Sequence, residues 1–220
     1  ASLGIKDIDI RVIKEVSSSA DPTQIEIHYP FVTKHTDYLL PRVMLEIGSR
    51  SMMEPCKDQE ISSLVFQQFT DRDFADKPFG VNTVLPERTF LEKVFLLHEE
   101  FQKPIENIRV DRMSRHLYDI EKMMSAGIAI KALEWRDLYQ DIVMHRIQMT
   151  KLKDVDYNLH QPKSINFIPP DKFIDSYEKD YGTMNEEMIY GERLSWKDLI
   201  ERLNELNKEI NSLKWQIEIP

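Results

Sequence analysis

The spacing of the apolar residues changes once along the chain, and this change constrains the fold more than any other feature. In the first third of the sequence, three short segments have the character of strands: 8–13, 24–29 and 42–47. The connector between the first two is too short for a helical crossover, so we expect an antiparallel arrangement. From Pro86 onward the apolar spacing becomes helical. Strands followed by helices predict an α+β fold, with a strand-rich part over residues 1–85 and a helical domain over 86–220.

The helical half is expected to contain several helices joined by loops. Phe90, Val94, Leu97 and Phe101 place one apolar face on the first of them. The helices predicted from such spacing are 86–101, 112–125, 134–150 and 195–213. Residues 58–70 read as a helix or a mixed segment, and 81–85 as a short strand. The polar, proline-bearing stretch 151–170 predicts a loop with one short strand near Ile165.

The last predicted helix has the clearest pattern. Its apolar residues are spaced 3, 4, 3, 4 and 3 apart: Trp196, Leu199, Leu203, Leu206, Ile210 and Leu213. Ser195 and Asp198 resemble a capping box at its start. Such a seam either packs against its own domain or forms a homodimer interface through residues 195–213.

Composition excludes several classes of protein. The 29 Lys and Arg residues against 38 Asp and Glu give a net charge of -9, which disfavours a protein that coats nucleic acid non-specifically. The single cysteine, Cys56, excludes an internal disulfide and a multi-cysteine zinc site. No apolar run approaches the roughly 18–20 residues of a membrane span, and no Rossmann or P-loop glycine motif is present. We therefore expect a cytoplasmic protein with no membrane contact.

Two charged residues stand at positions where the pattern calls for apolar ones. Glu46 lies within the apolar strand segment 42–47, where a carboxylate needs solvent, a partner or a metal ion. Lys93 shares the apolar face of the helix 86–101, so its ammonium must reach solvent along its aliphatic stem, form a pair or serve a site. The residues alone leave these alternatives open.

A polar stripe follows on the next predicted helix. Arg112, His116 and Asp119 are spaced i, i+4 and i+7, and Arg115 is four residues before Asp119. Two arginines, a histidine and an aspartate within two turns suit phosphate binding or a structural charge network.

Two other acidic pairs are weaker candidates. Asp71 and Asp73, preceded by Gly48-Ser49, imitate a nucleotidyltransferase motif, but the gap is about twice the usual one and the aspartates lie in loop-like sequence. We reject that pair. Asp7 and Asp9 enter the first strand, where alternating carboxylates usually form a solvated face.

Three blocks together resemble the nucleotidyltransferase AbiEii/AbiGii toxin family. They are residues 38–50 (YLLPRVMLEIGSR), 85–93 (LPERTFLEK) and 111–119 (DRMSRHLYD). The likeness covers roughly residues 20–125. It implies a nucleotidyltransferase-like lobe of antiparallel or mixed strands followed by a helical domain.

The resemblance also implies roles for individual residues. Glu46 matches the family's third acidic, metal-binding position, Lys93 its motif lysine and Asp119 its motif aspartate. The residues Arg112, Arg115 and His116 would then bind substrate phosphate. The implied reaction is Mg²⁺-dependent transfer of a nucleoside monophosphate from an NTP to an acceptor such as tRNA, by a toxin that has a cognate antitoxin.

One departure from the family pattern is clear. No Gly-Ser motif precedes Asp7-Ile8-Asp9, so we do not take this pair for the family's metal-binding Asp-x-Asp. We assign it instead to the strand that follows the N-terminal catalytic lobe in the family. We expect the chain to be the C-terminal portion of a longer enzyme, inactive without the triphosphate-binding half. The alternative is a non-catalytic domain that contacts an antitoxin, RNA or another copy.

Overall fold

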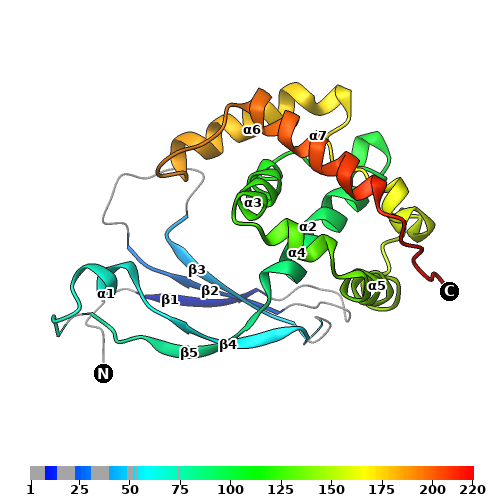
Figure 1. Ribbon diagram of the computed structural model, residues 1–220. Coiled ribbons are helices and arrows are strands. Elements are labelled where there is room, and N and C mark those ends of the chain that lie inside the picture. Colours follow the sequence, from blue (N-terminus) through cyan, green and yellow to red (C-terminus); the bar gives the residue numbers. More distant parts are fainter. Residues whose placement is uncertain (1–7, 14–22, 31–39, 49–51, 53, 74) are drawn as a thin grey trace.

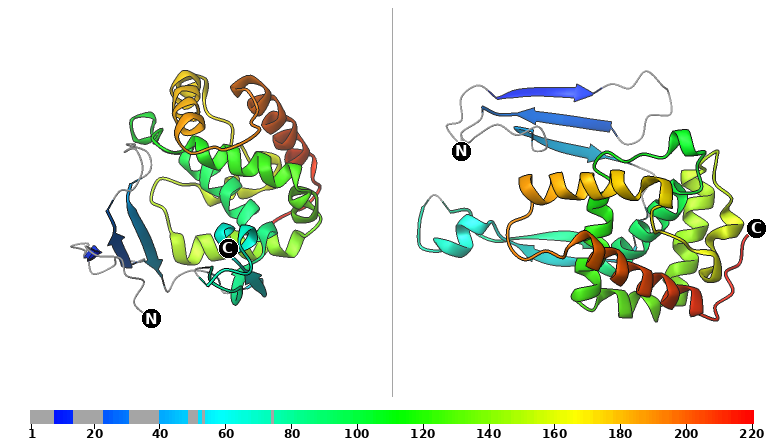
Figure 2. Two further views of the ribbon diagram at one scale, coloured as in Figure 1. Left: turned by 90° about the vertical axis from the view of Figure 1, so that its left-hand side faces the viewer. Right: turned by 90° about the horizontal axis from the view of Figure 1, so that it is seen from above.

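The computed structural model describes residues 8–13, 23–30, 40–48, 52, 54–73 and 75–220. Strands come first and helices follow, so the α+β prediction is confirmed. Figures 1 and 2 show the small sheets on one side of the molecule and the helices gathered on the other. Asp7, the connector 17–22, and the first two and last two residues of the block 38–50 lie outside the described residues.

The three predicted strands form one antiparallel sheet in the order β1-β2-β3. Their bounds are β1 Asp9–Ile13, β2 Thr23–His28 and β3 Arg42–Ile47. Within the register, Asp9 pairs with His28, and Gln24 pairs with Glu46. Because side chains alternate between faces, this register fixes what each face carries.

The two faces of this sheet differ in chemistry. On one face Glu26 is buried and bonded to its neighbours Arg42 and His28, the latter at 2.8 Å. The other face is apolar and mostly exposed; its outer-strand side chains are Ile10, Val12, Val43, Leu45 and Ile47. No helix is among the elements that pack closely on this sheet in the described part of the chain.

A second, two-stranded sheet forms an arm. β4 (Cys56–Ile61) pairs antiparallel with β5 (Phe79–Val84), and α1 (Leu64–Gln68) lies between them. The arm extends away from the helices in Figure 1. The segment predicted as a helix or a mixture is thus a strand and a short helix. The helix begins at Ser63, whose hydroxyl accepts from the Phe66 N–H at 3.0 Å.

Six α-helices follow residue 85 in the described chain. They are α2 (Pro86–Glu100), α3 (Ser114–Ser125), α4 (Ile128–Leu133), α5 (Arg136–His145), α6 (Ile174–Glu187) and α7 (Trp196–Ser212). Gly127 adopts φ 73° and starts α4, which the sequence did not predict. The helix α6 was also missed. A π-helical turn over Arg146–Thr150 extends α5 to the predicted end.

The predicted strand near Ile165 is wrong. Residues 157–160 and 162–164 form 3-10 turns, and Ile165 is buried in the helical core with 1% of its surface exposed. In the described part of the chain no strand pairs with it, and side-chain amides from α7 donate to its carbonyl instead: Asn207 at 3.2 Å and Asn211 at 2.9 Å.

The core lies among the helices, and the seam of α7 belongs to it. Leu199, Leu203, Leu206 and Ile210 are each at most 2% exposed. The predicted cap is present, since the Ser195 hydroxyl accepts from the Asp198 N–H at 3.1 Å. The seam therefore packs within its own domain, which accounts for its spacing without a second copy.

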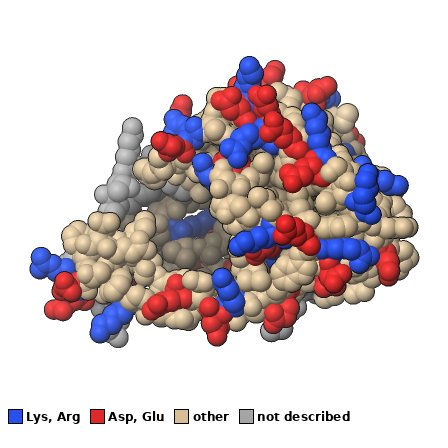
Figure 3. All heavy atoms as spheres, viewed as in Figure 1, with Lys and Arg blue, Asp and Glu red and all other residues tan. Residues whose placement is uncertain are grey.

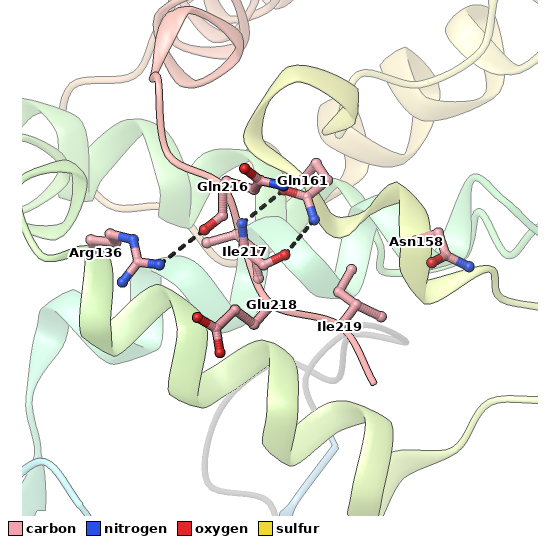
Figure 4. Close-up of a pocket in the computed structure, with 7 residues that line it drawn as sticks. All are labelled: Arg136, Asn158, Gln161, Gln216, Ile217, Glu218 and Ile219. Atoms are coloured by element: carbon pink, nitrogen blue, oxygen red, sulfur yellow. Dashed lines mark hydrogen bonds between the residues drawn. The ribbon is translucent and has the colours of Figure 1, made fainter.

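After α7 the chain runs as an extended tail against the helical domain. The Gln161 amide donates to the Ile217 carbonyl at 2.7 Å and accepts from its N–H at 2.9 Å. Arg136 donates to the Gln216 carbonyl at 2.9 Å. Figure 4 shows these bonds beside a polar cavity of about 650 Å³.

The boundary between the two parts falls between β5, which ends at Val84, and α2, which begins at Pro86. The division into domains 1–85 and 86–220 stays a prediction. In the described residues, no helix combines the length and the apolar character that a membrane crossing requires.

Candidate active site

The helix α2 positions Lys93 by burying the residues around it. Phe90, Val94 and Leu97 are fully buried, as their spacing predicts. Pro86 is tolerated at the first turn because its missing N–H has no helical partner there. Lys93 lies at the margin of this apolar face, with 22% of its side chain exposed.

A sharp entry into α3 positions the second part of the site. Arg112 has a left-handed backbone (φ 58°), which a non-glycine residue adopts only where its surroundings hold it. Asp180 of α6 supplies that support, because its carboxylate accepts from the N–H groups of Arg112 (2.8 Å) and Ser114 (2.9 Å) and from the Ser114 hydroxyl. An aspartate from another helix thus caps α3.

The two helices bring three predicted site residues together. Lys93 Nζ lies 2.8 Å from Asp119 Oδ2 and 3.5 Å from His116 Nδ1. Both partners come from α3, which packs against α2. The pair is partly exposed, with 40% of the Asp119 side chain open, so it adds little to stability. Its effect is to hold the ammonium in one orientation.

The histidine of this cluster is neutral. Burial, together with the nearby positive charges of Lys93 and Arg115, lowers the pKa of His116 from 6.5 to about 4, although the carboxylate of Asp119 acts in the opposite direction. At neutral pH the ring can therefore accept a hydrogen bond from the Lys93 ammonium. His116 adds no positive charge to the site.

Of the two arginines of the stripe, Arg115 is the one whose charge acts on this cluster. Arg115 is exposed, and its charge reaches His116. Arg112 is half-buried. The cluster thus has one exposed arginine beside an oriented ammonium, a combination that can bind a phosphate group. A cavity of about 380 Å³ opens beside Asp111 and Asp180 at the entry to α3.

Glu46 lies on β3 rather than in this cluster. Its side chain is on the polar face of the sheet, where it accepts from the Gln24 amide at 2.9 Å. Asp9 shares that face and pairs with Arg11 at 2.6 Å. Its companion Asp7 lies outside the described residues.

Figure 3 shows the molecule hollowed between the arm and the helices, with Lys or Arg atoms inside the hollow.

Glu46 suits a magnesium ion held jointly with a substrate. Among the described residues, no group of three or more His, Cys, Asp and Glu side chains is placed to hold a metal ion by itself. Mg²⁺, however, is commonly bound by one or two carboxylates together with substrate phosphates and water. An exposed carboxylate with one amide partner fits that use.

Sequence reasoning missed two ionic groups with buried members on α2, the helix that carries Lys93. Arg88 is 3% exposed and donates to Glu92 Oε1 at 2.9 Å and to the Met52 carbonyl at 2.7 Å. Near the end of the same helix, the Glu99 carboxylate accepts hydrogen bonds from Arg146 and from the buried His160. The hydrogen bonds from these two side chains outweigh the effect of burial and hold the pKa of Glu99 below its usual value. The i, i+4 spacing of Arg88 and Glu92 was the available signal.

Comparison with known proteins supports the family resemblance that rests on the sequence blocks 38–50, 85–93 and 111–119. The family model for "Nucleotidyl transferase AbiEii toxin, Type IV TA system" matches residues 2–202. No curated protein and no solved structure gives a significant match. Because the matched region spans most of the sequence and contains all three blocks, the chain belongs to the AbiEii nucleotidyl transferase toxin family of type IV toxin–antitoxin systems.

Proposed function

We propose that this protein transfers a nucleoside monophosphate from an NTP to an acceptor, and that the acceptor is tRNA. The observation that supports this most directly is the ion pair between Lys93 and Asp119 at 2.8 Å. It joins the last residues of two motif blocks within a family whose members are nucleotidyl transferase toxins.

Each residue of the cluster has a proposed task. The ammonium of Lys93 neutralises triphosphate charge as a compact cation, and Asp119 orients it. Arg115 and Arg112 add positive charge for phosphate. His116, with a pKa of about 4, accepts a hydrogen bond from Lys93 and leaves the ammonium its charge.

We assign the metal-binding role to Glu46. Its carboxylate would hold Mg²⁺ together with phosphate oxygens of the NTP. When bound, the ion polarises the α-phosphate and activates the acceptor hydroxyl. Because the net charge is -9, we infer that tRNA contacts a local positive surface rather than the molecule as a whole.

The family also implies a cognate antitoxin. We place the reaction in the cytoplasm, where nucleotides and tRNA are found.

The test is labelling of bulk tRNA with radioactive NTPs and Mg²⁺, by the natural full-length protein and its Lys93→Ala variant. We expect the variant to lose about 100-fold or more in labelling, as removal of a charge-stabilising group does. Lys103→Ala is a matched control, since Lys103 also pairs with a carboxylate at 2.8 Å and is similarly exposed (23% against 22%). Equal labelling by wild type and Lys93→Ala would contradict the role of Lys93.

A second candidate is binding without catalysis. The observation in its favour is the exposed apolar face of the sheet, where Ile10 and Ile47 are 64% and 60% exposed, because such patches mark interaction sites. If the wild-type protein labels tRNA with none of the four NTPs but forms a complex with its antitoxin or with a second copy, and Ile47→Asp abolishes that complex, this second function is the correct one.

A further inference from the structure

Arg88 carries a buried positive charge that the proposed chemistry does not use. It lies in the first turn of α2, with 4% of its side chain exposed. A guanidinium removed from water is costly unless its donors are satisfied. The Arg88 side chain donates to Glu92, one turn further along α2, and to the main-chain carbonyl of Met52.

The Met52 carbonyl belongs to the connector between β3 and β4, so this bond joins the strand-rich part to the helical domain. The side chain of Met52 packs against the helical core, and thus both its carbonyl and its side chain are held by helices. Nearby, the Leu85 N–H donates to the Pro55 carbonyl at 3.1 Å. The connector is therefore attached to the start of α2.

This attachment matters because the described strands of the sheet pack closely only on one another. The strands β1–β3 contact one another extensively, and none packs closely on a helix in the described residues. Met52 follows Glu46 by six residues, and Arg88 precedes Lys93 by five on the same helix. A bond from Arg88 to Met52 thus constrains how far the Glu46 carboxylate can move relative to the Lys93 ammonium.

We propose that Arg88 is a positioning residue that fixes the sheet carrying Glu46 relative to the helix carrying Lys93, by holding the Met52 carbonyl. The catalytic consequence rests on the proposed nucleotidyl transfer, whereas the geometric one does not. Glu92 has a supporting task, since it neutralises the buried guanidinium and directs it toward Met52.

The first experiment measures geometry without activity. Nitroxide labels at Ile10→Cys on β1 and Lys131→Cys on α4, in a Cys56→Ser background of the full-length protein, report the distance across the two parts by pulsed electron resonance. We expect Arg88→Met to broaden the distance distribution, and Arg88→Lys to broaden it less. Glu92→Gln, whose amide oxygen can still accept from Arg88 but no longer neutralises it, should broaden the distribution less than Arg88→Met does.

Arg146→Met is the matched control, because Arg146 is also buried and paired with a carboxylate, but within the helical domain. It should lower stability without changing the distance. Should Arg88→Met fail to fold by circular dichroism, Arg88→Lys carries the test. A distribution identical to wild type in a folded Arg88 variant overturns the proposal.

The second experiment measures transfer kinetics. We expect Arg88→Met to lower kcat about 100-fold, since displacements near 1 Å have effects of this size, while KM for the NTP changes less than about threefold. Arg88→Lys should recover part of kcat. Loss of kcat by Arg146→Met to the same extent would show a general stability effect and overturn the positioning role. If wild type transfers no nucleotide, the proposed function fails, but the distance measurement still decides the role of Arg88.

Discussion

At the scale of single residues, burial decides which charges the molecule keeps. His116 and His98 are both neutral because burial disfavours the imidazolium. Burial and a neighbouring histidine lower the pKa of His98 to about 4, while the Asn166 N–H donates to its Nδ1 at 3.1 Å. Glu99 keeps its negative charge, because Arg146 and His160 bond to it. Spacing along a helix reveals none of these environments.

The two histidines predict a pH dependence of folding. In the unfolded chain each binds a proton below about pH 6.5, but in the folded protein only near pH 4. The unfolded state therefore binds more protons between these values, and stability falls as the pH drops from 6.5 toward 4. Urea unfolding at pH 7 and pH 5 should show this loss.

Replacing either histidine by glutamine should reduce the pH dependence, whatever it does to stability at pH 7. The window above pH 5 is chosen because carboxylates with lowered pKa values, such as those of Glu99 and Glu100, stay ionised there. A double variant His98→Gln/His116→Gln as pH-sensitive as wild type would show that other groups are responsible.

At the scale of elements, pattern strength determined what the sequence could predict. The long amphipathic helices and the alternating strands were found, because each repeats its apolar spacing over several residues. The strand β4 was missed, since its residues 57–60 are all polar and exposed and its pairing with β5 defines it. The helix α6 was missed because its buried residues include no Leu, Ile or Val that would mark an apolar stripe: they are Tyr177, Tyr181, Met184 and Asn185.

The seam of α7 gives a prediction for this scale. Leu203 is fully buried, so Leu203→Asp should lower the free energy of unfolding by about 2–5 kcal/mol. The exposed Glu205→Ala on the same helix should change it by less than about 0.5 kcal/mol. Urea unfolding with size-exclusion chromatography measures both. A Leu203→Asp variant that stays as stable as wild type and elutes as a smaller species would instead show a dimer seam.

At the scale of the whole molecule, segments far apart in sequence complete the helical domain. The tail after α7 is held through its main chain by Gln140, Gln161 and Arg136, and Ile217 inserts its side chain with 2% exposed. The family match ends at residue 202, so this tail lies beyond it. We infer that the tail stabilises the domain by covering the region between α5 and the 3-10 turns.

Two neighbouring substitutions test this. Ile217→Ala should lower the free energy of unfolding by about 2–4 kcal/mol, because it leaves a cavity where an aliphatic side chain is buried. Glu218→Ala should have little effect, since the main chain of Glu218 makes its bonds with Gln140 and the side chain is exposed. Thermal unfolding followed by circular dichroism distinguishes them. Equal melting temperatures for wild type and Ile217→Ala would show that the tail is not part of the core.

The sequence by itself determined the fold class, the antiparallel arrangement of the first three strands and the family, because these depend on local periodicity and on motif blocks. It also identified Lys93 as a charge on an apolar face. Only the tertiary structure decided how that charge is satisfied, since Asp119 and His116 come from another helix. The same holds for Arg88 and Met52, which are 36 residues apart. Periodic spacing shows which face of an element is buried, but which side chains meet across such separations leaves no periodic trace in the sequence.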